Sequence, residues 1–157
     1  MNTARLIGAM AGGLVAGLAI TALLIKGEQD SGEPSELADL ERTTADRLGG
    51  ETPPADSLPD AREQAVIQSG HLALSLAAGA AYAAATDEDT PVVASGIGFG
   101  LAFYAAAHWL AGPILGLKQP EWKTGSKGIA MHTANHIGFG LITALGAKLA
   151  ERVARGR

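Results

Sequence analysis

Residues 91–117 read PVVASGIGFGLAFYAAAHWLAGPILGL, and this stretch decides the fold. It contains no Asp, Glu, Lys or Arg, and a helix of about 20 apolar residues is long enough to cross the hydrocarbon core of a bilayer. Residues spaced four apart lie on one side of a helix, and one such row in this stretch consists of Gly96, Gly100, Tyr104, His108 and Gly112. The stretch therefore predicts a transmembrane helix that carries one ionisable side chain on a row of mostly small residues.

The composition of the 157-residue chain suits helices packed closely in lipid better than it suits a soluble core. Hydrophobic residues make up 47% of the chain, but aromatic residues only 4%, and Ala and Gly are abundant. Small residues let helix backbones approach one another within a membrane. The absence of cysteine excludes disulfides and thiolate metal sites. Acidic charge is concentrated in one segment, which argues against a nucleic-acid partner.

Three further stretches, residues 1–26, 66–86 and 128–150, have the length and apolar character of membrane spans. The first is uncharged from residue 6 to residue 25. It is longer than the apolar region of a signal peptide and ends without a small-x-small cleavage site, so we expect an uncleaved helix, with a cleaved signal as the alternative. The sequence thus predicts an all-α, integral membrane four-helix bundle of close-packed, Gly/Ala-rich helices. Three of its spans form a domain over residues 66–150.

Polar segments separate these spans and set the expected topology. Residues 27–65 form an acidic, proline-containing linker, which we expect to be disordered apart from a short amphipathic helix between Ser35, its N-cap, and Leu48. Four spans place both termini on one side of the membrane. The basic tail at residues 151–157 predicts that this side is the cytoplasm, which makes the chain a multi-pass protein with both termini inside.

All four histidines lie within predicted spans, at the same face of the membrane. Because consecutive spans run in opposite directions, the start of the second, the end of the third and the start of the fourth meet at one face. At ~1.5 Å per residue the four imidazoles lie roughly 8–13 Å deep. Ionisable groups within a membrane are costly and usually mark a functional site. The sequence therefore predicts one intramembrane polar layer, formed by His71, His108, His132 and His136.

Three hypotheses for this layer remain open. The layer can be structural or pH-responsive, with interhelical hydrogen bonds that also involve Ser75, Tyr82, Tyr104 and Asn135. It can bind a transition metal or haem, with all four histidines as candidate ligands. It can line the path of a small proton or solute transporter or channel. No carboxylate is expected in the layer to orient a catalytic imidazole, and the sequence shows no catalytic motif, so we expect a protein that is not an enzyme.

Small residues at fourfold spacing predict where helices pack. The positions expected to lie at helix contacts are Gly79, Gly96, Gly100, Gly112, Gly128 and Gly140. Rows of this kind also support self-association of membrane helices. We therefore expect the lipid bilayer as the main partner, and a homo-oligomer formed through such faces as a second possibility.

From about residue 64 to residue 153 the chain resembles the YagU-type inner-membrane protein family, a family of unknown function. The motifs that carry the resemblance are His71, Ser75 and Tyr82 in the second span, His108, Pro113, Gly116, Leu117 and Pro120 in and after the third, and His136 in the last. The resemblance implies a bacterial inner-membrane protein with His71, His108 and His136 as intramembrane polar positions. His132 departs from the family pattern, in which that position is often acidic, and this argues against a metal site shared across the family. A role in envelope or stress physiology is the corresponding hypothesis.

Overall fold

The computed structural model describes residues 2–156 and is all-α, with no strand among those residues. The all-α prediction is therefore confirmed. The helices are α1 (Thr3–Ser31), α2 (Glu36–Arg47), α3 (Ala61–Ala85), α4 (Val92–Tyr104), α5 (Gly112–Ile114) and α6 (Gly125–Arg155). A π-helical segment, η1 (Ala105–Ala111), joins α4 to α5, and a 3-10 turn, η2 (Glu121–Lys123), precedes α6.

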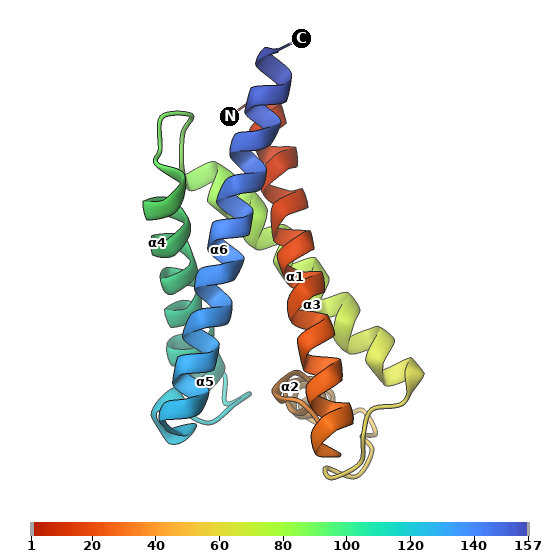
Figure 1. Ribbon diagram of the computed structural model, residues 1–157. Coiled ribbons are helices and arrows are strands. Elements are labelled where there is room, and N and C mark those ends of the chain that lie inside the picture. Colours follow the sequence, from red (N-terminus) through yellow and green to blue (C-terminus); the bar gives the residue numbers. More distant parts are fainter. Residues whose placement is uncertain (1, 157) are drawn as a thin grey trace.

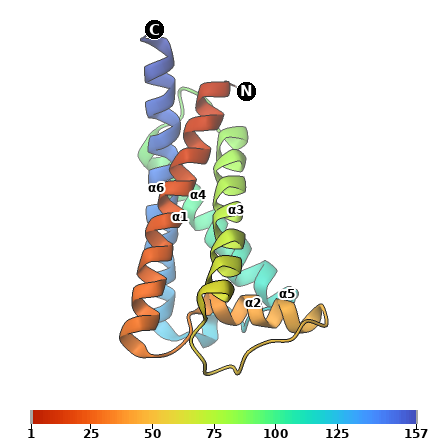
Figure 2. The ribbon, with the colours of Figure 1, turned by 90° about the vertical axis from the view of Figure 1, so that its right-hand side faces the viewer.

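The long helices form a row in which α1 lies between α3 and α6, and α4 packs on the other side of α6 (Figure 1). Both chain ends and the turn between α3 and α4 lie at the same end of the bundle, measured along the helix axes. The short helix α2 crosses the opposite end, close to α5 and the start of α6 (Figure 2). The bundle thus has two distinct ends, which we call the terminal end and the α2 end.

Two helical stretches are long and apolar enough to cross a membrane. One is α1, and the other is the continuous helix Val92–Ile114, formed by α4, η1 and α5. The remaining long helices, α3 and α6, do not reach the same mean hydropathy within the described residues. The structure therefore indicates association with a membrane, through the first and third of the spans that the sequence predicts.

Glycine rows hold the helix backbones of the bundle in direct contact. A Cβ atom on Gly8 would overlap the carbonyl of Gly146 in α6, and one on Gly79 would overlap the backbone of α1 at Ala9. On the other side of α6, a Cβ atom on Gly100 would overlap the carbonyl of His136. Such close contact is available only to residues without a side chain. Because α1 packs in this way against both neighbours, it is an integral part of the fold.

Four of the six predicted packing glycines lie at helix contacts, and two do not. Gly96 and Gly100 in α4 face Gly140 in α6. By contrast, Gly112 lies against the aliphatic stem of Lys118, and Gly128 against its near neighbour Thr124. The two exceptions lie beside the loop between α5 and α6, which folds back onto the helix ends. They make room for loop side chains instead of for a second helix.

Pro113 reshapes the end of the third predicted span. Proline has no N–H group to donate, and its ring collides with the carbonyl four residues earlier in an α-helix. Here the chain widens into the π-helical segment η1, and the N–H of Gly112 donates to the carbonyl of Ala107, five residues back. The helix then ends at Ile114. His108 lies inside η1, and π-helical turns of this kind often accompany functional sites.

The acidic linker is more ordered in the structure than the sequence predicts. α1 continues to Ser31, and α2 begins after Ser35, whose hydroxyl accepts the N–H of Ala38 as expected for an N-cap. Arg42 of α2 pairs with Glu63 of α3 at 2.6 Å. Its guanidinium also donates to the carbonyls of Pro54, Ala55 and Ser57. A nearly buried arginine that satisfies several carbonyls fixes a segment that has little apolar content of its own.

Candidate functional site

Charged and imidazole side chains from separate parts of the chain converge at the α2 end of the bundle. α2 contributes Glu36 in its first turn, η1 contributes His108, and α6 contributes His132. The loop between α5 and α6 contributes Lys118, and η2 contributes Glu121. We call these five residues the Glu–Lys–His network. Each belongs to a different element, so only the folded chain assembles the network.

Glu121 is the centre of the network and is fully buried. Its Oε1 accepts hydrogen bonds from the hydroxyl of Tyr104 at 2.7 Å and from Nδ1 of His132 at 2.6 Å. Its Oε2 accepts a hydrogen bond from Nζ of Lys118 at 2.8 Å. A buried carboxylate is tolerated when its oxygens are paired in this way. A carboxylate therefore lies among the histidines, and the expectation that their layer contains none is wrong.

The ammonium group of Lys118 uses its three donors on three different partners. Nζ donates to Oε2 of Glu121, to Nδ1 of His108 at 2.7 Å, and to Oε1 of Glu36. The stem of the side chain reaches this point by passing over Gly112, where a Cβ atom would overlap it. Lys118 therefore links the loop, η1 and α2 at a single point.

His132 bridges the two carboxylates of the network. Its Nδ1 faces Glu121, and its Nε2 lies 2.9 Å from Oε2 of Glu36. Because carboxylate oxygens only accept hydrogen bonds, this arrangement gives both ring nitrogens an acceptor. The imidazole is thus fixed in position and in rotation by two helices, α2 and α6, and by the turn η2.

The electrostatics of the network favour ionised side chains. Burial alone would raise the pKa of Glu36, but hydrogen bonds from His132 and Lys118 and the ammonium charge lower that pKa to about 2. Burial would likewise raise the pKa of Glu121, but hydrogen bonds from Lys118, His132 and Tyr104 lower it to about 2. Burial lowers the pKa of Lys118, yet its hydrogen bonds to the two carboxylates give a net rise. Two carboxylates and an ammonium therefore face one another as charges.

The structure brings three of the four predicted histidines together and leaves the fourth apart. The ring centroid of His108 lies 4.7 Å from that of His132 and 4.9 Å from that of His136. Nδ1 of His136 donates to the carbonyl of His132 at 2.8 Å, which keeps this ring nitrogen on its own helix. His71 instead places its Nδ1 3.2 Å from the hydroxyl of Thr21. The fold therefore brings the rings of His108, His132 and His136 together and places His71 against α1.

The polar residues predicted to support the histidines have separate roles. Tyr104 joins the network through Glu121, whereas the hydroxyl of Ser75 donates to the carbonyl of His71. The hydroxyl of Tyr82 lies 2.7 Å from that of Ser95, near the terminal end of the bundle and away from the network. Asn135 is half-buried, and between residues 2 and 156 no hydrogen bond joins its side chain to the network. Only one of the four therefore contacts the site.

A cavity of about 500 Å³ lies beside the network, between α2 and the start of α6. Glu36, Lys118 and His132 contribute to its wall, together with Leu40 and Met131. The wall is part apolar and part charged, so the network borders on open space as well as on packed side chains. Water and small solutes therefore have a route to the edge of the site.

Three network residues, Glu36, Lys118 and Glu121, are not among the site residues that the sequence predicts. Glu36 lies in the predicted acidic linker, and Lys118 and Glu121 lie in the connection between the third and fourth predicted spans. The sequence does contain one indication. The connection between the third and fourth predicted spans lies at the membrane face where the histidines are expected, so its charged side chains are near them. A lysine side chain at the end of a span often lies along apolar surface with its ammonium group displaced toward polar surroundings. The direction in which such a side chain extends depends on the loop conformation, which the sequence does not give.

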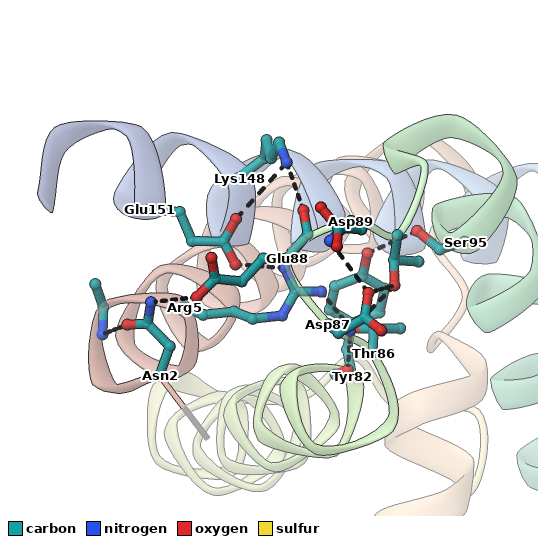
Figure 3. Close-up of polar contacts among 12 residues, drawn as sticks. Asn2, Arg5, Tyr82, Thr86, Asp87, Glu88, Asp89, Ser95, Lys148 and Glu151 are labelled. Atoms are coloured by element: carbon teal, nitrogen blue, oxygen red, sulfur yellow. Dashed lines mark hydrogen bonds and ion pairs between the residues drawn. The ribbon is translucent and has the colours of Figure 1, made fainter. Parts of the chain in front are cut away.

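A second polar cluster lies at the terminal end of the bundle (Figure 3). Nη1 of Arg5 in α1 contacts Oε1 of Glu151 in α6 at 2.7 Å, and both side chains are buried. Arg5 also donates to the hydroxyl of Thr86 at the end of α3 and lies over the ring of Tyr82. Lys148 donates to the carbonyl of Glu88 in the following turn. This cluster joins three helices. Among the described residues, Nε of Arg5 and Oε2 of Glu151 are buried and accept or donate no hydrogen bond, and Oε2 of Glu151 has Nζ of Lys148 3.9 Å away.

No family model, no curated protein and no solved structure matches this chain. The resemblance to the YagU-type family therefore stays a hypothesis, and the site has to be interpreted from its own geometry.

Proposed function

We propose that this chain is a non-enzymatic, multi-pass protein of the bacterial inner membrane, in which the Glu–Lys–His network latches α2 onto a four-span bundle. One observation carries the proposal. Glu36, in the first turn of α2, contacts both Lys118 and His132 and so completes a network that is otherwise part of the bundle. The role of the network is to hold the polar helix α2 against the membrane-embedded helices. This corresponds to the first of the three hypotheses, in which the histidines have a structural role.

The outer surface of the helices supports four spans. Each long helix exposes large apolar side chains, among them Leu18 and Leu23 of α1, Val66 and Leu74 of α3, Val93 and Leu110 of the third span, and Ile142, Leu145 and Leu149 of α6. On α3 and α6, polar residues such as Gln68 and His132 lower the mean hydropathy, but Gln68 contacts Thr21 of α1 and His132 contacts Glu36 of α2. Apolar residues outside and polar residues inside are typical of a bundle in lipid.

The α2 end has features of a membrane–water interface. Trp109 and Trp122 lie with ring centroids 6.1 Å apart, and both are exposed. Tryptophan is enriched at the level of the lipid headgroups. A latch at this level holds α2 along the surface of the membrane. The basic residues after Glu151 support a cytoplasmic location of the opposite, terminal end.

Cysteine accessibility tests the four-span arrangement, because the natural chain contains no cysteine. Single substitutions Asp89→Cys and Gln119→Cys place a thiol at the terminal end and at the α2 end, respectively. In oriented membrane vesicles, a membrane-impermeant maleimide is expected to label one of them in right-side-out vesicles and the other in inverted vesicles. Labelling of both from the same side contradicts the proposal.

Limited proteolysis tests the latch. Arg47, at the end of α2, donates to the carbonyls of Leu115 and Gly116, so docking protects this trypsin site. Glu121→Ala removes the centre of the network, and we expect cleavage after Arg47 to become several-fold faster. Lys123→Ala, in the same turn but at an exposed residue, is the matched control and should leave the rate unchanged. Equal cleavage rates for Glu121→Ala and the natural chain contradict the latch.

A further inference from the structure

Three side chains of the network point nitrogen and oxygen atoms at one small region of space. One atom each from Glu36, His108 and His132 lies within 4.8 Å of the other two. Nε2 of His132 lies 2.9 Å from Oε2 of Glu36, and Nδ1 of His108 lies 3.8 Å from Oε1 of Glu36. Ligands of a four-coordinate ion with bonds of ~2.0–2.1 Å lie roughly 3.4 Å apart. The contacts of Glu36 with the two imidazoles, at 2.9 and 3.8 Å, are therefore near this spacing, and the three side chains converge as the ligands of one ion would.

The orientation of His132 matches that of a metal-binding histidine. Such a histidine almost always donates its second ring N–H to a carboxylate or a carbonyl, which fixes the ring and makes the ligand nitrogen more basic. Here Nδ1 of His132 donates to fully buried Glu121 at 2.6 Å, which leaves Nε2 directed at the cluster. Glu121 is thus placed as an orienting residue and Glu36 as a ligand.

The position between these atoms is already used by a positive charge. Nζ of Lys118 contacts Nδ1 of His108 and a carboxylate oxygen of Glu36, two of the three candidate ligands. The site therefore accommodates a cation between an imidazole and carboxylates. Lys118 also lines the 500 Å³ cavity beside the network. A lysine side chain is long and flexible, so its ammonium group can move into this space when another cation takes its place.

We propose that Glu36, His108 and His132 form a binding site for a divalent transition-metal ion, for which Lys118 is a tethered competitor. Two imidazoles and one carboxylate suit Zn²⁺, and three protein ligands leave a fourth position for water or a solute. The two carboxylates of the network match the charge of a divalent ion. This site replaces the ligand set of four histidines, because His71 lies elsewhere and Nδ1 of His136 is bonded to its own helix. The inference rests on the proposed docking of α2, because Glu36 reaches the two imidazoles only in the docked arrangement.

Zinc binding by the full-length, tag-free protein in detergent tests the proposal. Isothermal titration with Zn²⁺ and elemental analysis after dialysis should give one ion per chain. Lys118→Met should bind Zn²⁺ about tenfold more tightly. An ammonium group that occupies the site in about nine molecules of ten leaves one in ten free to bind, and the substitution removes this competition. Glu121→Gln should weaken binding by ~10–100-fold, as loss of an orienting carboxylate does. Co²⁺ in the same site should give the visible absorption of a four-coordinate ion.

Matched variants separate this site from adventitious binding. His108→Ala should abolish stoichiometric binding, whereas His71→Ala, at the histidine outside the cluster, should leave the affinity unchanged. Lys118→Met also guards against misfolding as an explanation, because an unfolded variant does not gain affinity. The proposal is overturned if neither the natural protein nor Lys118→Met binds one Zn²⁺, or if His108→Ala binds it as tightly as His71→Ala. Protection of Arg47 from trypsin without any zinc binding would retain the latch and reject the metal site.

Discussion

Arg5 and Glu151 are 146 residues apart in sequence and form an ion pair of 2.7 Å in which both side chains are buried. The pair joins the first turn of α1 to the end of α6, and it lies at the terminal end of the bundle, opposite α2 (Figures 1 and 3). The structure therefore connects its first and last helices through polar contacts at one end and through glycine contacts between α1 and α6 along their length.

Breaking the Arg5–Glu151 pair should destabilise the fold strongly. Arg5→Met leaves the buried carboxylate of Glu151 without its hydrogen-bonded partner and with only Lys148 at 3.9 Å, and removal of one member of a buried pair costs ~3–5 kcal/mol. The double variant Arg5→Met/Glu151→Met should recover a large part of this loss, because neither charge is then unpaired. Thermal unfolding in detergent measures both. The control is Lys26→Met at the exposed Lys26–Asp30 pair, which should change stability by less than ~0.5 kcal/mol.

Two glycines of α4, two residues apart, should respond in opposite ways to alanine. At Gly100 a Cβ atom overlaps the carbonyl of His136, so Gly100→Ala should lower stability by ~1–3 kcal/mol. At Gly98 nothing lies within 4 Å, so Gly98→Ala should raise stability by ~0.5–1 kcal/mol through helix propensity alone. The difference between the two melting temperatures is the readout. Equal shifts would mean that α4 does not pack on α6 through this face.

The two carboxylates of the Glu–Lys–His network should differ in importance. Glu121 is fully buried and has three partners, whereas the side chain of Glu36 is 37% exposed. Glu121→Gln should therefore cost ~3–5 kcal/mol, and Glu36→Gln clearly less, because solvent partly replaces its contacts. Unfolding in detergent, measured without added metal, makes the comparison. A larger loss in Glu36→Gln contradicts the assignment of Glu121 as the centre.

We expect α1 to remain part of the folded protein. It lies between α3 and α6, and Gly13 packs against the backbone of α3 as Gly12 does against that of α6. Removal of α1 would expose the faces of α3 and α6 that pack against it, and it would leave Glu151 without Arg5. Mass spectrometry of protein purified from membranes should therefore detect the tryptic peptide of residues 6–26. Its absence from folded protein would support the cleaved-signal alternative.

The sequence by itself determined the helical character of the chain, most helix positions and the N-cap at Ser35. These features depend on apolar length, composition and capping, which are local properties of the chain. It also placed His108, His132 and His136 at one face, because alternating helix direction fixes depth. Gly96 and Gly100 of α4, which are four residues apart, lie at the contact with Gly140 of α6 as the spacing indicated, since residues four apart share one side of a helix.

Only the tertiary structure decided which side chains meet. Depth does not fix the rotation of a helix, so His71 faces Thr21 instead of the other imidazoles. Nor does sequence fix the path of a loop, which brings Lys118 and Glu121 into the site, or the docking of α2, which brings Glu36. Contacts between residues distant in sequence depend on the packing of the whole chain. The charged half of the site therefore became visible only in the folded protein.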